Sequence, residues 1–460
     1  MNKTYYVILL VVSASMCRSL IPQPCHAQTK LHAANAQSTR NESPALVPSG
    51  DGGVIVLWRS VMARGCTISA QKFDKHGKEV WKNGGVDICT QPTNDANFSA
   101  VTDTRGGVIV FWEDTRGGKY ASDIYAQRLD ASGRPVWESG GVPVCTARHQ
   151  QLFPHAVVDQ HGGAYAFWTD YRNGNADIYG CHTDSNGKVI RKFAVCTESE
   201  DQMHLSVAAS PSGGACVVWV DHRYDNPGIY AELIDASDSV CWRRNGLPIC
   251  TGLYQPESPS VSAVGNGRFL FTWDDYRDRV SKVFLQLVDA DGKEAKPSNG
   301  VSVRTSGGPQ YSPSICVTSS SGAAVTWLQY GKGAEMLQQR MDLSGNMRLK
   351  PEVQLSKASL AQLWVRSVPD GSGGVVCVWL KYAGDRTEVF AQRTDSQGRL
   401  NWGRDGLLLG PAGGEAHPRV LSSGPNGILF VSWTKRSGTS SKIIVVALAE
   451  TGSRIWKGQL

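Results

Sequence analysis

The stretch that decides the fold is residues 108–145, VIVFWEDTRGGKYASDIYAQRLDASGRPVWESGGVPVC. Residues 108–112 form a continuous apolar run, which is typical of a strand buried on both faces. Residues 123–130 alternate between apolar and polar side chains as in a half-buried strand, and Asp130 and Gly133 then supply a tight turn. With further strands expected over 97–103 and 142–145, the sequence predicts a unit of four antiparallel strands.

The same unit recurs along the chain, because an apolar run that ends in tryptophan returns every 51–56 residues. These tryptophans are Trp58, Trp112, Trp168, Trp219, Trp273, Trp327, Trp379 and Trp433. Four short strands repeated at such a spacing are typical of the blades of a β-propeller. We therefore expect an all-β fold, a single eight-bladed β-propeller of four-stranded antiparallel blades. A seven-bladed ring and two smaller rings are the alternatives.

Ahead of the repeats, the sequence has the features of a secretory signal peptide. Lys3 precedes an apolar run over residues 5–16, and Ala27 offers a small residue at a cleavage site. That run is shorter than the roughly 20 residues of a membrane-spanning helix. The expected parts of the chain are a signal peptide, a polar linker and the propeller, over 1–27, 28–42 and 43–460.

The expected destination is therefore outside the cytoplasm: secreted, periplasmic or at the cell surface, without membrane insertion. A lipoprotein attached through Cys17 or Cys25 is a weaker alternative, because Met16 and Pro24 stand where a small residue is expected. The net charge of +6 is too small to indicate nucleic-acid binding.

Residues 111–146 resemble a repeat of secreted bacterial β-propeller proteins, with the pattern GG-apolar-W-x-D-x-R, DIYAQR, D-x-x-G, W and G-x-P-apolar-C. The pattern extends over all eight units and is strongest in the second to fifth. The resemblance implies the propeller fold and export, and it implies no activity. The turn from Asp130 to Trp137 is only a distant analogue of the sialidase Asp-box, because its Gly and Trp stand at other spacings.

In four consecutive units, an aspartate directly after the tryptophan strand stands two residues before an arginine. These residues are Asp114 and Arg116, Asp170 and Arg172, Asp221 and Arg223, and Asp275 and Arg277. Because such pairs make charge-assisted hydrogen bonds at a strand end, a repeated clamp between blades is the favoured interpretation. A ring of ligand-binding groups is the functional alternative. Calcium is a third interpretation, for residues 170–177, which alternate oxygen-bearing side chains around a glycine.

Two further sets of polar residues belong to the same expected face of the ring. Glutamines stand seventeen residues before the tryptophan, where one unit leads into the next, at Gln151, Gln202, Gln310 and Gln362. They either hydrogen-bond the neighbouring blade or line the channel mouth. Glu113 and Asp274 directly follow the tryptophan, and in an eightfold ring we expect them to face each other across the channel mouth. Together with the Asp and Arg pairs they form the candidate ligand-binding face, where the longer loops 117–123, 146–154 and 222–228 also lie.

The sequence carries no standard catalytic motif and no residue set typical of a zinc site. Cys89, Cys145, Cys196 and Cys250 stand at equivalent positions and are expected to be buried and free, and a local bridge between Cys181 and Cys196 is left open. We therefore predict an exported, monomeric, non-enzymatic binding or scaffold propeller that recognises a surface glycan or a protein partner without a cofactor. The alternative is a glycan-active hydrolase or lyase, which would need two facing carboxylates.

Overall fold

The computed structural model describes residues 40–62, 65–89, 97–118, 121–252, 254–304, 307–319, 322–331, 333–349, 352–356, 362–383, 386–413, 416, 418–422 and 427–460. The predicted signal peptide and most of the predicted linker lie outside these residues. Within them every regular element is a β-strand. None of the described residues belongs to a helix that is long and apolar enough to cross a membrane.

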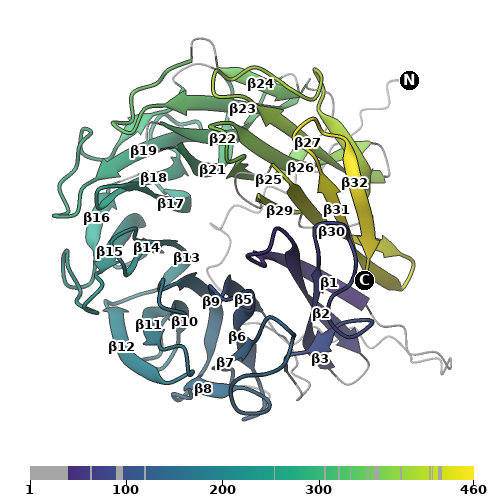
Figure 1. Ribbon diagram of the computed structural model, residues 1–460. Coiled ribbons are helices and arrows are strands. Elements are labelled where there is room, and N and C mark those ends of the chain that lie inside the picture. Colours follow the sequence, from purple (N-terminus) through teal and green to yellow (C-terminus); the bar gives the residue numbers. More distant parts are fainter. Residues whose placement is uncertain are drawn as a thin grey trace, which may run out of the picture. The chain divides into compact units, whose positions relative to one another are not determined.

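The described strands follow one another in units of four around a central channel (Figure 1). The first four units consist of β1 (Arg40–Pro48), β2 (Val54–Met62), β3 (Gly65–Phe73), β4 (Val86–Asp87), β5 (Phe98–Thr102), β6 (Val108–Asp114), β7 (Asp123–Leu129), β8 (Val142–Cys145), β9 (Gln151–Val158), β10 (Ala164–Asp170), β11 (Asp177–Thr183), β12 (Val189–Cys196), β13 (Gln202–Ala209), β14 (Ala215–Asp221), β15 (Gly228–Ile234) and β16 (Leu247–Cys250).

The last four units consist of β17 (Glu257–Gly265), β18 (Arg268–Asp275), β19 (Lys282–Val288), β20 (Val301–Ser302), β21 (Gln310–Ser319), β22 (Gly322–Tyr330), β23 (Ala334–Met341), β24 (Val353–Ser356), β25 (Gln362–Pro369), β26 (Val375–Ala383), β27 (Arg386–Thr394), β28 (Leu407–Pro411), β29 (Arg419–Ser422), β30 (Leu429–Ser437), β31 (Ser440–Leu448) and β32 (Arg454–Gln459). The first strand of each unit lines the channel, and the fourth lies at the rim of the ring (Figure 1).

The four strands of each unit pair antiparallel in chain order, so the predicted propeller of four-stranded antiparallel blades is confirmed. Six units are separate four-stranded sheets. The first and last units merge into one eight-stranded sheet through a parallel bridge between Arg40 and Ser441. The described residues therefore form eight four-strand units, one for each sequence repeat. They form seven hydrogen-bonded sheets, which is the number in the predicted alternative.

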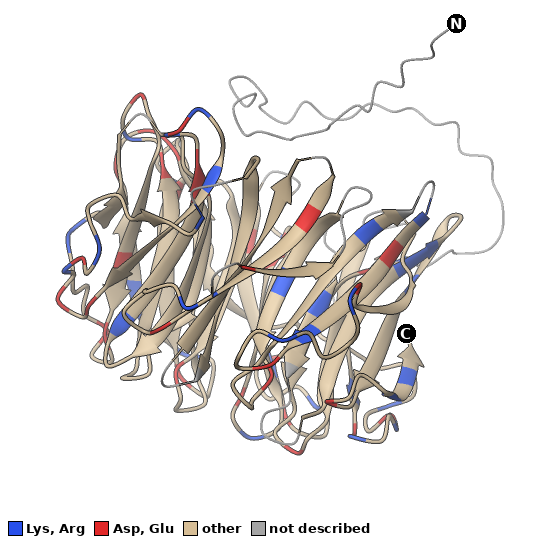
Figure 2. Cartoon of the chain, turned by 90° about the horizontal axis from the view of Figure 1, so that it is seen from above, with Lys and Arg blue, Asp and Glu red and all other residues tan. Residues whose placement is uncertain are grey.

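Apolar side chains on the second and third strands fill the spaces between neighbouring units. Trp112 is fully buried and packs with Leu57 and Ile68 of the preceding unit. The ring closes in the same way, because Trp58 of the first unit packs with Phe430 and Ile443 of the last. Charged residues lie at many of the turns, and others lie within strands (Figure 2).

A glycine is required where the fourth strand approaches the tryptophan. A Cβ atom on Gly141 would lie 2.3 Å from the Trp112 ring, and its φ of 89° is a conformation that other residues rarely adopt. The Gly-Gly pair before the fourth strand is thus explained by close packing against the tryptophan.

Candidate functional site

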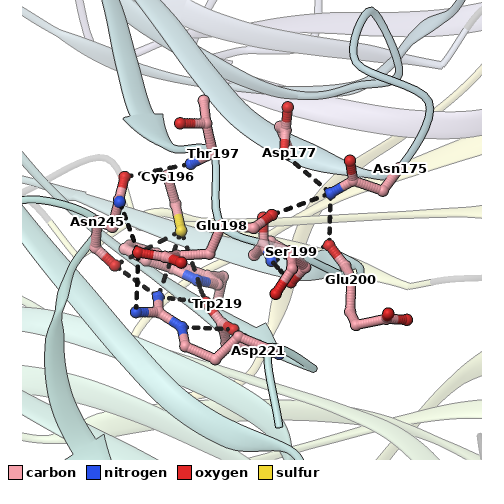
Figure 3. Close-up of polar contacts among 12 residues, drawn as sticks. Asn175, Asp177, Cys196, Thr197, Glu198, Ser199, Glu200, Trp219, Asp221 and Asn245 are labelled. Carbon is pink, nitrogen blue, oxygen red and sulfur yellow. Dashed lines mark hydrogen bonds and ion pairs between the residues drawn. The ribbon is translucent and has the colours of Figure 1, made fainter.

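The aspartate and arginine after the tryptophan strand form a buried cluster, shown for the fourth unit in Figure 3. Trp219 Nε1 donates a hydrogen bond of 2.8 Å to Asp221 Oδ2. Arg223 binds both carboxylate oxygens, with Nε to Oδ1 at 2.9 Å and Nη2 to Oδ2 at 2.6 Å. Its guanidinium lies 4.0 Å from the centroid of the Tyr230 ring, and Cys196 of the preceding unit donates to Asp221. One carboxylate therefore ties the strand end to two aromatic side chains and to the neighbouring unit.

The same arrangement, which we call the D-x-R clamp, recurs in the second, third and fifth units. All four aspartates are at most 1% exposed. The four arginine side chains are 11–27% exposed. The clamp residues are Asp114 and Arg116, Asp170 and Arg172, Asp221 and Arg223, and Asp275 and Arg277. These contacts fit the favoured interpretation, a repeated clamp between blades. The aspartates are buried, and only part of each arginine side chain reaches the surface.

The loop considered for calcium satisfies its carboxylates internally. Asp170 binds Arg172 and Trp168, while Asp177 accepts hydrogen bonds of 2.6 Å and 3.1 Å from the amides of Asn173 and Asn175. No group of three or more His, Cys, Asp or Glu side chains among the described residues is arranged to hold a metal ion.

The four predicted glutamines are fully buried between units. Two of them bond the segment just before their own strand. Gln151 donates to the carbonyls of Arg148 and His149. Gln202 donates to the carbonyls of Ser199 and Glu200. Gln310 accepts from the Val283 amide, and Gln362 donates to the Ala334 carbonyl. Gln310 and Gln362 therefore hydrogen-bond the neighbouring blade, as in the favoured interpretation, whereas Gln151 and Gln202 bond the link that leads into their own unit. None of the four glutamines lines the channel mouth.

Glu113 and Asp274 are each 2% exposed, so they do not face each other across the channel mouth as the sequence analysis expected. Each carboxylate instead accepts a hydrogen bond from a backbone amide of the next unit. Phe153 N lies 2.5 Å from Glu113 Oε1, and Ser312 N lies 3.2 Å from Asp274 Oδ1. Burial, with a contribution from the nearby Glu257, raises the pKa of Asp274 to about 8.

The amides held in this way belong to a β-bulge that recurs on the innermost strands. In β9, β13, β17, β21 and β25 the pairing with the second strand shifts near the start of the first strand, where a residue takes a φ between 51° and 60°. These five bulge residues are Phe153, His204, Ser258, Ser312 and Trp364, and all five are exposed. A positive φ is unfavourable for such residues, and a repeated strained conformation is a reason to suspect function.

Sequence reasoning missed the five bulge residues, although a signal was present. In four units the bulge residue stands two residues after the repeated glutamine, as Phe153 does after Gln151 and Trp364 after Gln362. Phe153 is 52% exposed and Trp364 is 42% exposed, which is unusual for large apolar side chains on a central strand. The bulge turns these side chains out of the core and presents them on the inner surface of the ring.

A second surface feature lies where the sequence analysis expected variable loops. A cavity of about 240 Å³ is lined by Tyr224, Asn226, Gly228, Tyr230, Thr251 and Gly252. Tyr224, in the loop between β14 and β15, is 68% exposed. The cavity offers one aromatic ring together with amide and hydroxyl groups.

Comparisons with known proteins bear on the fold. Neither the protein-family models nor the curated proteins contain a match. Among solved structures the chain is similar to the lectin BP39L from Burkholderia pseudomallei, with a TM-score of 0.54 and 10% identity over 80% of this chain and 99% of that chain. Weaker similarity, at a TM-score of 0.44 and 8% identity, extends to the polysaccharide lyase Uly1 over 92% of this chain and 94% of that chain.

A lectin from the fungus Aleuria aurantia, described as a six-bladed β-propeller, gives a TM-score of 0.38 and 12% identity over 72% of this chain and 96% of that chain. At these identities the similarity shows the propeller fold alone.

Proposed function

We propose that the protein is an exported, monomeric β-propeller that binds a surface glycan without cleaving it. The observation that carries the proposal is the set of five bulge residues, which display two aromatic side chains, a histidine and two hydroxyl groups on the inner strands. Aromatic faces pack against the apolar faces of sugar rings, while hydroxyl and imidazole groups exchange hydrogen bonds with sugar hydroxyls. A rigid ring that holds these groups in place loses little entropy on binding.

The buried acids support this proposal indirectly. Glu113 and Asp274 fix the amides of two bulge residues and are themselves shielded from solvent. They therefore act as positioning residues for the binding surface. Export, the monomeric state and binding without a cofactor belong to the same proposal.

The test is a glycan-array screen of the mature protein, combined with an assay for released oligosaccharide. We expect retained glycan and no release, and at least tenfold weaker binding by the double variant Phe153→Ala, Trp364→Ala. The matched control is Ile190→Ala, since Ile190 is also 52% exposed but lies on an outermost strand. Unchanged binding by the double variant contradicts the proposed site, and binding only to a protein partner contradicts the glycan proposal.

A glycan-active hydrolase or lyase is the second candidate, and one observation favours it. Asp274, with a pKa of about 8, is protonated at neutral pH, and its register partner Glu257 on the neighbouring strand is a second carboxyl group. Glycoside cleavage uses a protonated acid and a carboxylate on either side of the scissile bond, so this function requires the segment that covers Asp274 to open. Release of oligosaccharide that is lost in Asp274→Asn and kept in the control Ile190→Ala would establish this function.

A further inference from the structure

One register position on the inner strands is occupied by basic residues in three of the eight units. This position faces the residue before the repeated tryptophan, as in the pairs Arg366 with Val378, Arg419 with Ser432, and His155 with Phe167. In the remaining units, serine or alanine occupies the equivalent position: Ala45, Ser99, Ser206, Ser260 and Ser314. The basic residues are therefore a departure of this ring from its own repeat.

The three basic residues lie on first strands of their units, which line the central channel (Figure 1). Arg366 lies on β25 and Arg419 on the neighbouring β29, while His155 lies on β9. Burial, with a smaller contribution from the charge of Arg419, lowers the pKa of His155 to about 4. Arg366 is exposed, and His155 and Arg419 are half-buried. Each of the three side chains therefore keeps some contact with water.

Within the described residues, no carboxylate forms an ion pair with Arg366 or Arg419. The hydrogen bond that Arg366 makes is to the Val365 carbonyl, at 2.9 Å. Burial lowers the pKa of Arg366, and burial together with Arg366 lowers that of Arg419 to about 10. By contrast, Arg128 near the other end of the strands is paired with Asp103 at 3.0 Å. Unpaired guanidinium groups that repel each other in a confined space are destabilising unless an anion joins them.

An apolar hollow lies along four other first strands of the ring. A cavity of about 260 Å³ runs along β1, β5, β9 and β13 and is lined mainly by apolar side chains, among them Leu46, Val47, Ala100, Val101, Val157 and Ala209.

We propose that Arg366, Arg419 and His155 form a binding site in the central channel for the carboxylate or sulfate group of an acidic glycan. The inference rests on the proposed glycan-binding function and adds the charge class of its ligand. The two guanidinium groups bind the anion through charge-assisted hydrogen bonds, and His155 donates a further hydrogen bond. The exposed bulge residue Trp364 lies two residues before Arg366 on the same strand, so the anion site adjoins the aromatic surface.

The test compares the mature protein with the double variant Arg366→Gln, Arg419→Gln in equilibrium binding to polygalacturonate, dextran sulfate and neutral dextran. The charge-matched control is Arg134→Gln, Arg399→Gln, because these two side chains are 81% and 78% exposed in outer turns. A third variant, Arg366→Lys, Arg419→Lys, keeps the charge. Thermal unfolding with and without galacturonate or inorganic sulfate gives a second readout on the same four proteins.

We expect the wild type to prefer one of the two acidic polymers to dextran. The glutamine double variant should bind that polymer at least roughly tenfold more weakly, the control should stay within about twofold, and the lysine variant should keep most of its affinity. The small anion that matches the preferred polymer should raise the melting temperature of the wild type and not that of the glutamine variant. Preference for the carboxylate or for the sulfate polymer identifies the group that is bound.

Equal loss in the glutamine variant and in the control overturns the inference, because it shows a general charge effect. Equal binding of dextran and the acidic polymers by all variants also overturns it, while the proposed glycan binding survives. If no polymer binds but the small anions stabilise only the proteins that keep both positive charges, the anion site survives and the glycan function fails.

Discussion

Replacing Glu232 by glutamine should stabilise the protein, and by an amount that depends on pH. In five other units a glutamine occupies this position on the third strand: Gln71, Gln127, Gln286, Gln339 and Gln392. Each of these amides donates to a backbone carbonyl of the segment before the fourth strand, as Gln127 does to the Glu138 carbonyl at 2.8 Å. Glu232 accepts two backbone amides through Oε1, but its Oε2 atom is buried without a hydrogen-bond partner.

The expected gain in the free energy of unfolding follows from the raised pKa of the Glu232 carboxyl group. Glu232 is fully buried, and this burial raises its pKa from 4.5 to about 7 despite the hydrogen bonds from backbone amides. A shift of that size corresponds to about 3 kcal/mol. Because the folded state holds the proton more tightly, stability falls as the pH rises from about 4.5 to about 7, and the full loss is present above pH 7. Glutamine does not ionise and supplies the missing donor.

The assay is urea unfolding of wild type and Glu232→Gln at pH 5 and pH 8. We expect the variant to be more stable by about 3 kcal/mol at pH 8 and by much less at pH 5. The reverse change in the next unit, Gln286→Glu, is the matched control and should destabilise mainly at pH 8. A gain of less than about 1 kcal/mol at pH 8, or an equal gain at both pH values, would refute the reasoning.

Trp168→Ala should lower the free energy of unfolding by about 3–5 kcal/mol, because the indole is 1% exposed between two units; a loss below about 1 kcal/mol in urea unfolding would show that the core is misplaced. Asp221→Ala leaves Arg223 and the Trp219 indole without their shared partner, so the free energy of unfolding should fall by about 3–5 kcal/mol. The glycan affinity of the folded variant should be unchanged. A stable variant with weakened binding would instead assign the clamp to the ligand site. His182 bonds to Asp159 and Asp238 and stacks on Tyr165, and although burial lowers its pKa, the two carboxylates raise it above the ordinary value. His182→Gln should therefore destabilise more at pH 5.5 than at pH 9, and a pH-independent difference would contradict this.

The repeat was predictable because its signal is local and periodic. The apolar run before each tryptophan marks the second strand, and the turn residues on either side fix the strand ends, so four strands per unit follow from one copy. Departures from the repeat also have visible consequences. Where Ser60, Gln329 and Lys381 replace the clamp aspartate, the indole Nε1 atoms of Trp58, Trp327 and Trp379 are buried without a hydrogen-bond partner.

The proposed binding surface was not predictable from local preferences, because it depends on the register between strands. A β-bulge places Phe153 and Trp364 at a positive φ that neither residue favours by itself. Long-range contacts decide the roles of the acids too: Glu113 and Asp274 look like exposed strand-end acids in the sequence, but the next unit covers them. Asp238 stands where most units have glycine in the third-to-fourth-strand turn. Its φ of 63° keeps the turn, while its carboxylate binds His182 of the preceding unit.

The central claim is that the inner strands bind a glycan and leave it intact. Hydrogen–deuterium exchange of the mature protein, with and without the tightest ligand from the array, locates the bound glycan. Mass analysis of the same samples shows whether that glycan has been cut. We predict slower exchange in residues 151–155 and 362–366 with intact glycan recovered. Protection confined to the outer loops, no protection at all, or recovery of shortened glycan would contradict the account.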